Sequence, residues 1–225
     1  MLQTELLIGT VGWEHEKWVG GFYPSDLPGD WRFGYYSNRL RSVLVPESFW
    51  RKAEAEGLIE TIQEDLYPEF RMVLQWSLPE SKDARNATQA FLELSRVFDD
   101  NVDAYLVNVP RKSSPGMLQA MELLQQYHPV CICCVDAPPA REFSEIEGVS
   151  QCWRPELESK PVPSGAFLVT LTQNTEPRAI REIIEQVDAW PEGRPLVQGA
   201  ALFFENDKAA DTAFQARTIA ELMGV

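Results

Sequence analysis

The sequence predicts one α/β domain, residues 1–225, that closes into a single-domain (β/α)8 barrel of the TIM type. Apolar runs of strand length recur along the chain, and helical patterns or loops follow them. Eight such runs within 225 residues favour a closed barrel. An open, doubly wound sheet stays as the alternative, because the sixth run is weak. The sequence contains no internal repeat, linker or second domain.

The strands are expected where apolar and β-branched residues cluster. The eight runs cover residues 5–11, 42–45, 70–78, 104–109, 130–135, 149–153, 166–172 and 200–205. Strict alternation of these runs with helical patterns predicts that all the strands are parallel.

Amphipathic patterns predict the helices that connect the strands. They are expected at residues 31–40, 47–65, 86–98, 115–127, 138–147, 176–190 and 208–223. Pro115 stands at the first position of its helix, where proline is favoured. Gly57 lies inside the 47–65 pattern and predicts a weak point there.

The chain carries a formal net charge of −14, with a pI near 4.6. Such a surface repels phosphate backbones, so nucleic acid is not expected as a partner. No apolar run is long enough to cross a membrane, and no basic leader precedes the first strand. We therefore expect no membrane association and a cytoplasmic location.

Three of the four cysteines lie within the apolar run 130–135. This context predicts buried core side chains, with Cys131 and Cys133 on one face of a strand and Cys134 on the other. A metal site is the alternative, but neither histidine has a ligand spacing to these cysteines. No phosphate loop or dinucleotide fingerprint is present. We therefore expect neither a metal nor a cofactor.

Polar residues near the carboxyl ends of the strands are the candidates for a site, because active sites of parallel barrels lie there. Strand faces that pack on helices should be apolar, so a polar residue inside an apolar strand is expected to point into the barrel. The candidate ligand-binding residues are Gln75, Asn108, Thr170 and Thr172 in the lumen, and Asn206 after the eighth strand. The alternative is a buried polar layer whose members satisfy one another.

Three residues are candidates for catalysis. His15 follows the first strand and is the better candidate for a general base, with a surface loop histidine as the alternative. Asp136 and Glu205 lie at or near strand tops and are able to form a carboxylate pair. Acidic residues at such positions also cap helices, which we favour for Asp207. The sequence does not decide between a catalytic role and a helix-capping role for Glu205.

Aromatic residues are dense in the first fifty residues, among them Trp13, Trp18 and Trp50. One interpretation is that they pack the long first loop over the barrel mouth. The other is that they form a stacking wall for a sugar or base ring, with Trp13 as a ligand contact.

The segment IGTVGWEHEKWVGGFYP, residues 8–24, resembles the opening of the YecE-like family, an uncharacterised family of (β/α) barrels. That family begins with G-T-S-G-W, followed by W-x-G-x-F-Y-P. The segment VLVPESFW, residues 43–50, is similar to the family's V-E-x-N-S-T-F-Y, and FEND, residues 204–207, is similar to its F-N-N-D. The resemblance implies the same barrel fold.

The residues expected at the barrel mouth differ from those of the YecE-like family. Charged or hydrogen-bonding residues of the family are replaced, in chain order, by Leu44, Pro46, Gln75, Asn108, Thr170 and Thr172. Most of these positions are neutral here, while the packing motif is kept. We therefore predict a diverged YecE-like member that keeps the fold but not the family's own site.

Two functions follow from these observations. The neutral lumen and the scarcity of histidines favour a barrel without strong catalysis, which binds a small molecule at its mouth or a protein partner on its acidic exterior. The alternative is a metal-independent hydrolase or lyase that acts on a small polar substrate through Asp136 and Glu205. The sequence does not decide whether the protein is an enzyme.

Overall fold

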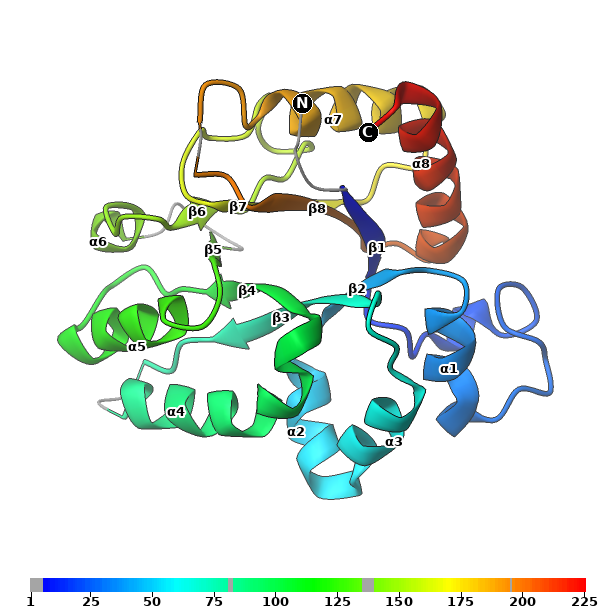
Figure 1. The fold of residues 1–225 in the computed structure, drawn as a ribbon, viewed down its shortest axis with the longest axis horizontal. Coiled ribbons are helices and arrows are strands. Elements are labelled where there is room, and N and C mark those ends of the chain that lie inside the picture. Colours follow the sequence, from blue (N-terminus) through cyan, green and yellow to red (C-terminus); the bar gives the residue numbers. More distant parts are fainter. Residues whose placement is uncertain (1–5, 81–82, 135–139, 195) are drawn as a thin grey trace.

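Eight parallel strands form one sheet in this computed structural model, which describes residues 6–80, 83–134, 140–194 and 196–225 (Figure 1). Neighbours along the sheet follow the order β6-β5-β4-β3-β2-β1-β8-β7. The strands are β1 (Leu7–Val11), β2 (Ser42–Val45), β3 (Arg71–Ser77), β4 (Val102–Asn108), β5 (Val130–Cys133), β6 (Ser150–Gln151), β7 (Phe167–Thr172) and β8 (Gly199–Phe204).

The two ends of this sheet meet where β6 approaches β7. Trp153, just after β6, forms an isolated parallel bridge with Thr170. The Trp153 amide donates to the carbonyl of Val169 (2.9 Å), and the Leu171 amide donates to the carbonyl of Trp153 (3.0 Å). The sheet is therefore a nearly closed barrel, which confirms the predicted (β/α)8 fold over the open sheet.

A close backbone approach holds the segment before β7 against β6. Gly165 has a φ of +67°, in the left-handed region that glycine favours. A methyl group on its Cα would lie 2.2 Å from the Ser150 nitrogen and 2.4 Å from the Val149 carbonyl carbon. The Ser150 hydroxyl also donates to the Phe167 carbonyl. Both the backbone angle and the lack of space therefore require glycine at this position.

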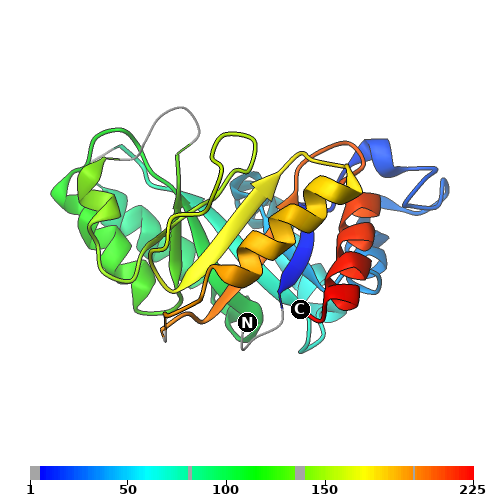
Figure 2. The same cartoon turned by 90° about the horizontal axis from the view of Figure 1, so that it is seen from above.

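Helices cover the outside of the barrel, and Figure 2 shows α7 lying along β7. The helices are α1 (Arg32–Ser37), α2 (Glu47–Glu56), α3 (Leu58–Asp65), α4 (Ala84–Ser95), α5 (Pro115–Gln125), α6 (Arg141–Ser144), α7 (Pro177–Ala189) and α8 (Ala209–Met223), with 3-10 turns η1 (Glu16–Trp18), η2 (Gly29–Trp31) and η3 (Arg96–Asn101). The predicted 47–65 helix divides at Gly57, whose φ is +68°. No helix in the described part of the chain is both long and apolar enough to cross a membrane.

The barrel interior is filled by an apolar cluster of its own. It consists of Leu44, Val73, Ala104, Leu106, Cys131, Cys133, Phe167, Val169, Leu171, Ala201 and Phe203. Strand residues that alternate with these, such as Val43 and Leu74, belong to the larger cluster between sheet and helices. Cys131 and Cys133 share the interior face, as predicted. The lumen is thus a packed core rather than a pore.

Thr170 and Thr172 do not point into the lumen, so that prediction was wrong. Val169 and Leu171 fill the lumen, and side chains alternate along a strand, so the threonines lie on the opposite face of β7. The rule failed because it assigned the apolar face of a strand to the outside, whereas this lumen is itself apolar. The Thr172 hydroxyl donates to Glu156 Oε1 (2.6 Å).

The β1–α1 loop packs its aromatic side chains against the neighbouring helices. The ring of Trp13 lies 5.0 Å from the rings of both Phe33 and Phe49, and Trp13 is buried. The Tyr23 hydroxyl donates to the Trp13 carbonyl (2.6 Å). These contacts are those expected of a packing role for Trp13.

A buried tyrosine ties the first two strands together. The Tyr36 hydroxyl donates to the Ser42 carbonyl (2.8 Å) and accepts a bond from the Thr10 amide (3.2 Å). Because Tyr36 has no exposed surface, no water replaces these bonds.

Candidate functional site

Amide side chains from β3 and β4 lie on the lumen side at the top of the barrel. Gln75 follows Val73 by two positions and Asn108 follows Leu106 by two, so both share the face of the interior cluster. The Glu47 amide donates to Gln75 Oε1 (3.3 Å). Asn108 Nδ2 donates to the Ser77 hydroxyl (3.0 Å). Asn108 Oδ1 is buried and has no hydrogen-bond partner among the described residues.

Glu205, a predicted catalytic carboxylate, is held by a cation from the β6–β7 segment. Arg154 Nη1 forms an ion pair with Glu205 Oε1. The two side chains are only 23% and 21% exposed, so water screens the pair weakly. The pair neutralises the Glu205 charge at the mouth and gives this carboxylate a partner other than a second acid. Its predicted partner Asp136 lies outside the described residues.

Two cysteine thiols lie beside this ion pair. Cys133 ends β5 and Cys152 follows β6, so their side chains are neighbours in the strand register, and the Cys152 thiol donates to the Trp153 carbonyl (3.9 Å). Interaction with Cys152 lowers the pKa of the Cys133 thiol to about 7; burial opposes this effect, and the positive charge of Arg154 adds to it. Interaction with Cys133 and burial raise the pKa of the Cys152 thiol well above its ordinary value. Cys133 is therefore the member of the pair whose charged form is favoured.

A pocket of about 740 Å³ opens at the carboxyl ends of β4 and β5. Its wall comes from the β3–α4 segment, the β4–α5 loop and the end of β5: Glu80, Asn108, Val109, Pro110, Arg111, Lys112, Ser113, Ser114, Met117, Cys133 and Cys134. Its volume is typical of small-molecule sites. Of the described residues, two cations and one acid line it, so this part of the wall is basic in a chain of net charge −14.

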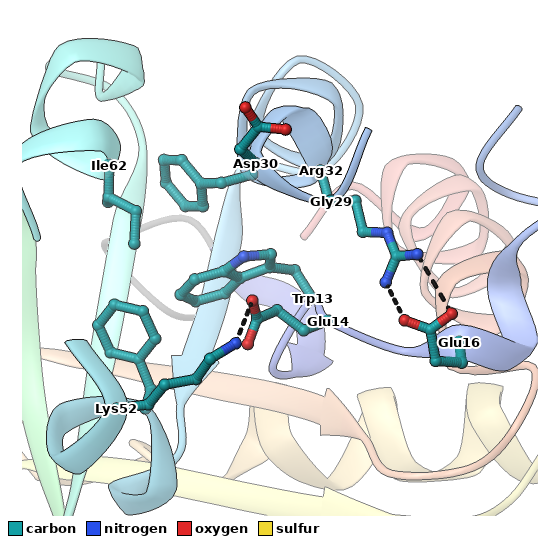
Figure 3. Close-up of a pocket in the computed structure, with 10 residues that line it drawn as sticks. Trp13, Glu14, Glu16, Gly29, Asp30, Arg32, Lys52 and Ile62 are labelled. Carbon is teal, nitrogen blue, oxygen red and sulfur yellow. Dashed lines mark hydrogen bonds and ion pairs between the residues drawn. The ribbon is translucent and has the colours of Figure 1, made fainter. Parts of the chain in front are cut away.

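A second pocket, of about 420 Å³, lies between the β1–α1 loop and helices α1, α2 and α3 (Figure 3). Trp13 stands in its wall, and four of its charged residues form two ion pairs. Arg32 Nη1 bonds Glu16 Oε1 (2.6 Å), and Lys52 Nζ bonds Glu14 Oε1 (3.4 Å). No strand residue lines this pocket, so it lies away from the barrel mouth where sites of this fold occur.

His15 lies next to the mouth, but its ring is engaged by neighbours. His15 Nε2 is 2.8 Å from the Val11 carbonyl, and the ring centroid lies 4.2 Å from that of Trp18. A carbonyl only accepts, so Nε2 must carry the proton and is not free to act as a base in this arrangement. The catalytic role of His15 stays a prediction.

Asn206 forms hydrogen bonds just before the start of α8. Its Oδ1 accepts from the Lys208 amide (2.8 Å), and its Nδ2 donates to the Gln173 carbonyl (3.3 Å). Asp207 does not cap α8 as predicted. It bonds Lys17 Nζ (2.7 Å) on the protein surface instead, which links the β8–α8 and β1–α1 loops.

The comparison with family models decides the family. The model described as "Protein of unknown function DUF72" matches residues 7–137, more than half of the chain. The chain belongs to the DUF72 family. A search of curated proteins gives no match.

Solved structures support the fold of this DUF72 protein. A DUF72 family protein from Enterococcus faecalis V583 is 13% identical, with 96% of each chain covered and a TM-score of 0.60. The UMP synthase of Leishmania donovani is 12% identical, with a TM-score of 0.50 over 83% of this chain and 46% of that one. At these identities the likeness shows a common barrel fold only.

Sequence reasoning missed the group formed by Cys133, Cys152 and Arg154 in this DUF72 protein. Cys131, Cys133 and Cys134 were predicted as core side chains. Arg154 lies after the sixth predicted strand run, 149–153, where no site residue was expected. A partial signal existed, because runs 130–135 and 149–153 were predicted as consecutive parallel strands. Aligning the first residues of the two runs places Cys133 beside Cys152.

Proposed function

We propose that this DUF72 protein binds a small polar molecule in the pocket at the carboxyl ends of β4 and β5, without strong catalysis. The observation that carries the proposal is the pocket of about 740 Å³, which Asn108 lines; Oδ1 of Asn108 has no hydrogen-bond partner in the described part of the chain. A buried acceptor without a bond costs about 1–3 kcal/mol, and a donor from a ligand would remove that cost.

The charge of the pocket favours an anionic group on the ligand. Among the described residues, Arg111, Lys112 and one acid, Glu80, line the wall. The rest of the chain is strongly acidic and repels anions, so this basic region is where a carboxylate or phosphate group would be held. We therefore propose a small molecule with an anionic group and a hydrogen-bond donor.

The state of Glu205, one of the three predicted catalytic residues, supports binding over acid–base chemistry. Glu205 is paired with Arg154. Proton transfer requires a group that is free to take up or release a proton at the substrate.

We also infer that the chain is a diverged YecE-like member. Leu44 is buried in the lumen, and Gln75 and Asn108 put neutral amides where the resemblance implies other groups. Conversion of any bound ligand at an ordinary enzymatic rate would contradict the loss of chemistry.

The test is thermal stabilisation by a library of phosphorylated and carboxylated metabolites. Three proteins are compared: the wild type, Asn108→Ala, and Asn86→Ala as a control on the exposed face of α4. A ligand at a hundred times its Kd stabilises by about 2.7 kcal/mol. At about 2–4 °C per kcal/mol for a chain of this size, the Tm of the wild type and the control should rise by roughly 5–11 °C.

Asn108→Ala should weaken the binding of the same compound by about 3- to 10-fold, the effect of one lost hydrogen bond. Equal stabilisation of all three proteins would place the ligand elsewhere and overturn the proposal. Absence of any stabilising compound would overturn it as well, and would direct the search to a protein partner for the acidic exterior.

A further inference from the structure

We propose that Cys133 and Cys152 are an oxidisable dithiol at the barrel mouth, which a peroxide converts into a disulfide. This inference is independent of the proposed ligand, since it rests on the two thiols and their neighbours alone.

The strand register brings the two cysteines together. In the β5–β6 pairing, Cys131 faces Ser150 and Ile132 faces Gln151, so Cys133 and Cys152 form the next pair. The Cys152 amide donates to the Ile132 carbonyl (2.8 Å), which continues the ladder past the end of β6. Neighbouring strands lie about 4.8 Å apart, and a disulfide needs Cα atoms about 4.4–6.8 Å apart.

The side chains also point the same way. Cys133 belongs to the interior cluster, and Cys152 packs against that cluster. The two side chains are thus neighbours on one face of the sheet, so disulfide formation requires rotation of the side chains and no change of strand pairing. Neighbouring Cys134 bonds the Val109 carbonyl instead (3.6 Å).

The two thiols differ in the way that a peroxide reaction requires. The thiolate is the nucleophile, and Cys133 is the thiol whose charged form is favoured, by Cys152 and by Arg154. Cys133 lines the 740 Å³ pocket, which gives a small oxidant a route to it. Burial raises the pKa of Cys131 to about 12, so Cys131 stays a thiol of the core.

The reaction balances in two steps. The Cys133 sulfur attacks one peroxide oxygen and the O–O bond breaks, which gives a sulfenic acid on Cys133 and a hydroxide; the hydroxide takes up the proton that the Cys133 thiol released on ionisation and becomes water. The Cys152 sulfur then attacks the Cys133 sulfur and the S–O bond breaks; the Cys152 proton leaves with the hydroxide as water. Two thiols and one hydrogen peroxide yield one disulfide and two waters.

A metal site is a weaker explanation of the same cysteines. Among the described residues no three His, Cys, Asp or Glu side chains gather closely enough to hold a metal ion. The guanidinium of Arg154 lies beside the thiols and would repel a cation.

The first experiment maps the bond. The native protein is treated with hydrogen peroxide, unfolded, alkylated and digested with trypsin, and the peptides are analysed by mass spectrometry. Peptide 113–141, which contains Cys131, Cys133 and Cys134, should appear joined to peptide 142–178, which contains Cys152. Cys134→Ser, the matched control, should give the same joined pair.

Two variants identify the steps. Cys152→Ser should stop at a sulfenic acid on Cys133, which dimedone traps, and Cys133→Ser should leave Cys152 reduced. A linkage through Cys131 or Cys134, or no linkage in the wild type, would overturn the proposal. Because the wild type is itself informative, a variant that fails to fold does not remove the test.

A pH profile tests the role assigned to the thiolate. The alkylation rate of Cys133 by iodoacetamide should fall about tenfold per pH unit below pH 7 and level off above it, because the thiolate is lost as pH falls through a pKa of about 7. Arg154→Met should move the midpoint to higher pH. A midpoint that stays near an ordinary thiol pKa in the wild type would contradict the activation of Cys133.

Discussion

Replacing Gly165 by alanine has two energetic costs, one from the positive φ and one from the lack of space for a methyl group. The φ of +67° costs alanine about 1–2 kcal/mol. The new methyl group would lie 2.2 Å from the Ser150 nitrogen, a backbone atom that cannot rotate away, and forcing such a contact costs about 1–3 kcal/mol more. The smaller entropy of the unfolded alanine chain returns about 0.4–1 kcal/mol. We expect the free energy of unfolding to fall by about 1–4.6 kcal/mol.

Gly193→Ala is the matched control for this prediction. Gly193 has a φ of +70°, but no atom lies within 4 Å of the position that its Cβ would take. It therefore carries the backbone cost alone and should lose about 0–1.5 kcal/mol. Urea unfolding followed by circular dichroism measures both variants, with equal m-values showing that only stability has changed. Equal losses in the two variants would refute the close approach between Gly165 and β6.

Two further substitutions test interactions described above. Tyr36→Phe removes the hydrogen-bond partner of the buried Ser42 carbonyl and Thr10 amide, so the free energy of unfolding measured in urea should fall by about 1–3 kcal/mol. The control Tyr35→Phe should change it by less than about 0.5 kcal/mol. Equal losses in the two variants would contradict the hydrogen-bond network of Tyr36. Arg154→Met leaves Glu205 unpaired and should cost about 1–3 kcal/mol, and adding Glu205→Gln should recover more than half of that loss. Additive losses in the double variant would show that the pair is not coupled.

The fold could be predicted because its strands are long apolar runs separated by helical patterns. The second strand, 42–45, was placed with the bounds found in the structure, and the break at Gly57 was expected from its low helix propensity. The sixth strand was weak in the sequence for a physical reason, since β6 has only two residues.

The candidate site could be predicted only in part. Gln75 and Asn108 were placed on the lumen side because the apolar residues that alternate with them pack on helices. The same rule failed for Thr170, since nothing in β7 alone distinguishes an apolar lumen from an apolar outer face. The contact between Cys133 and Cys152 depends on strand register, which a linear sequence does not display.

The short contact between β6 and β7 determines which strand becomes a sheet edge when the barrel opens. Only a short ladder closes the barrel there, so this seam is where the fewest bonds must break for the sheet to open. Opening would expose β7, a strand of six fully buried residues with the sequence FLVTLT, as a sheet edge. An uncharged apolar edge of that kind recruits strands from other chains. The small strand β6 and its bridge at Trp153 therefore guard the protein against aggregation as well as completing the barrel.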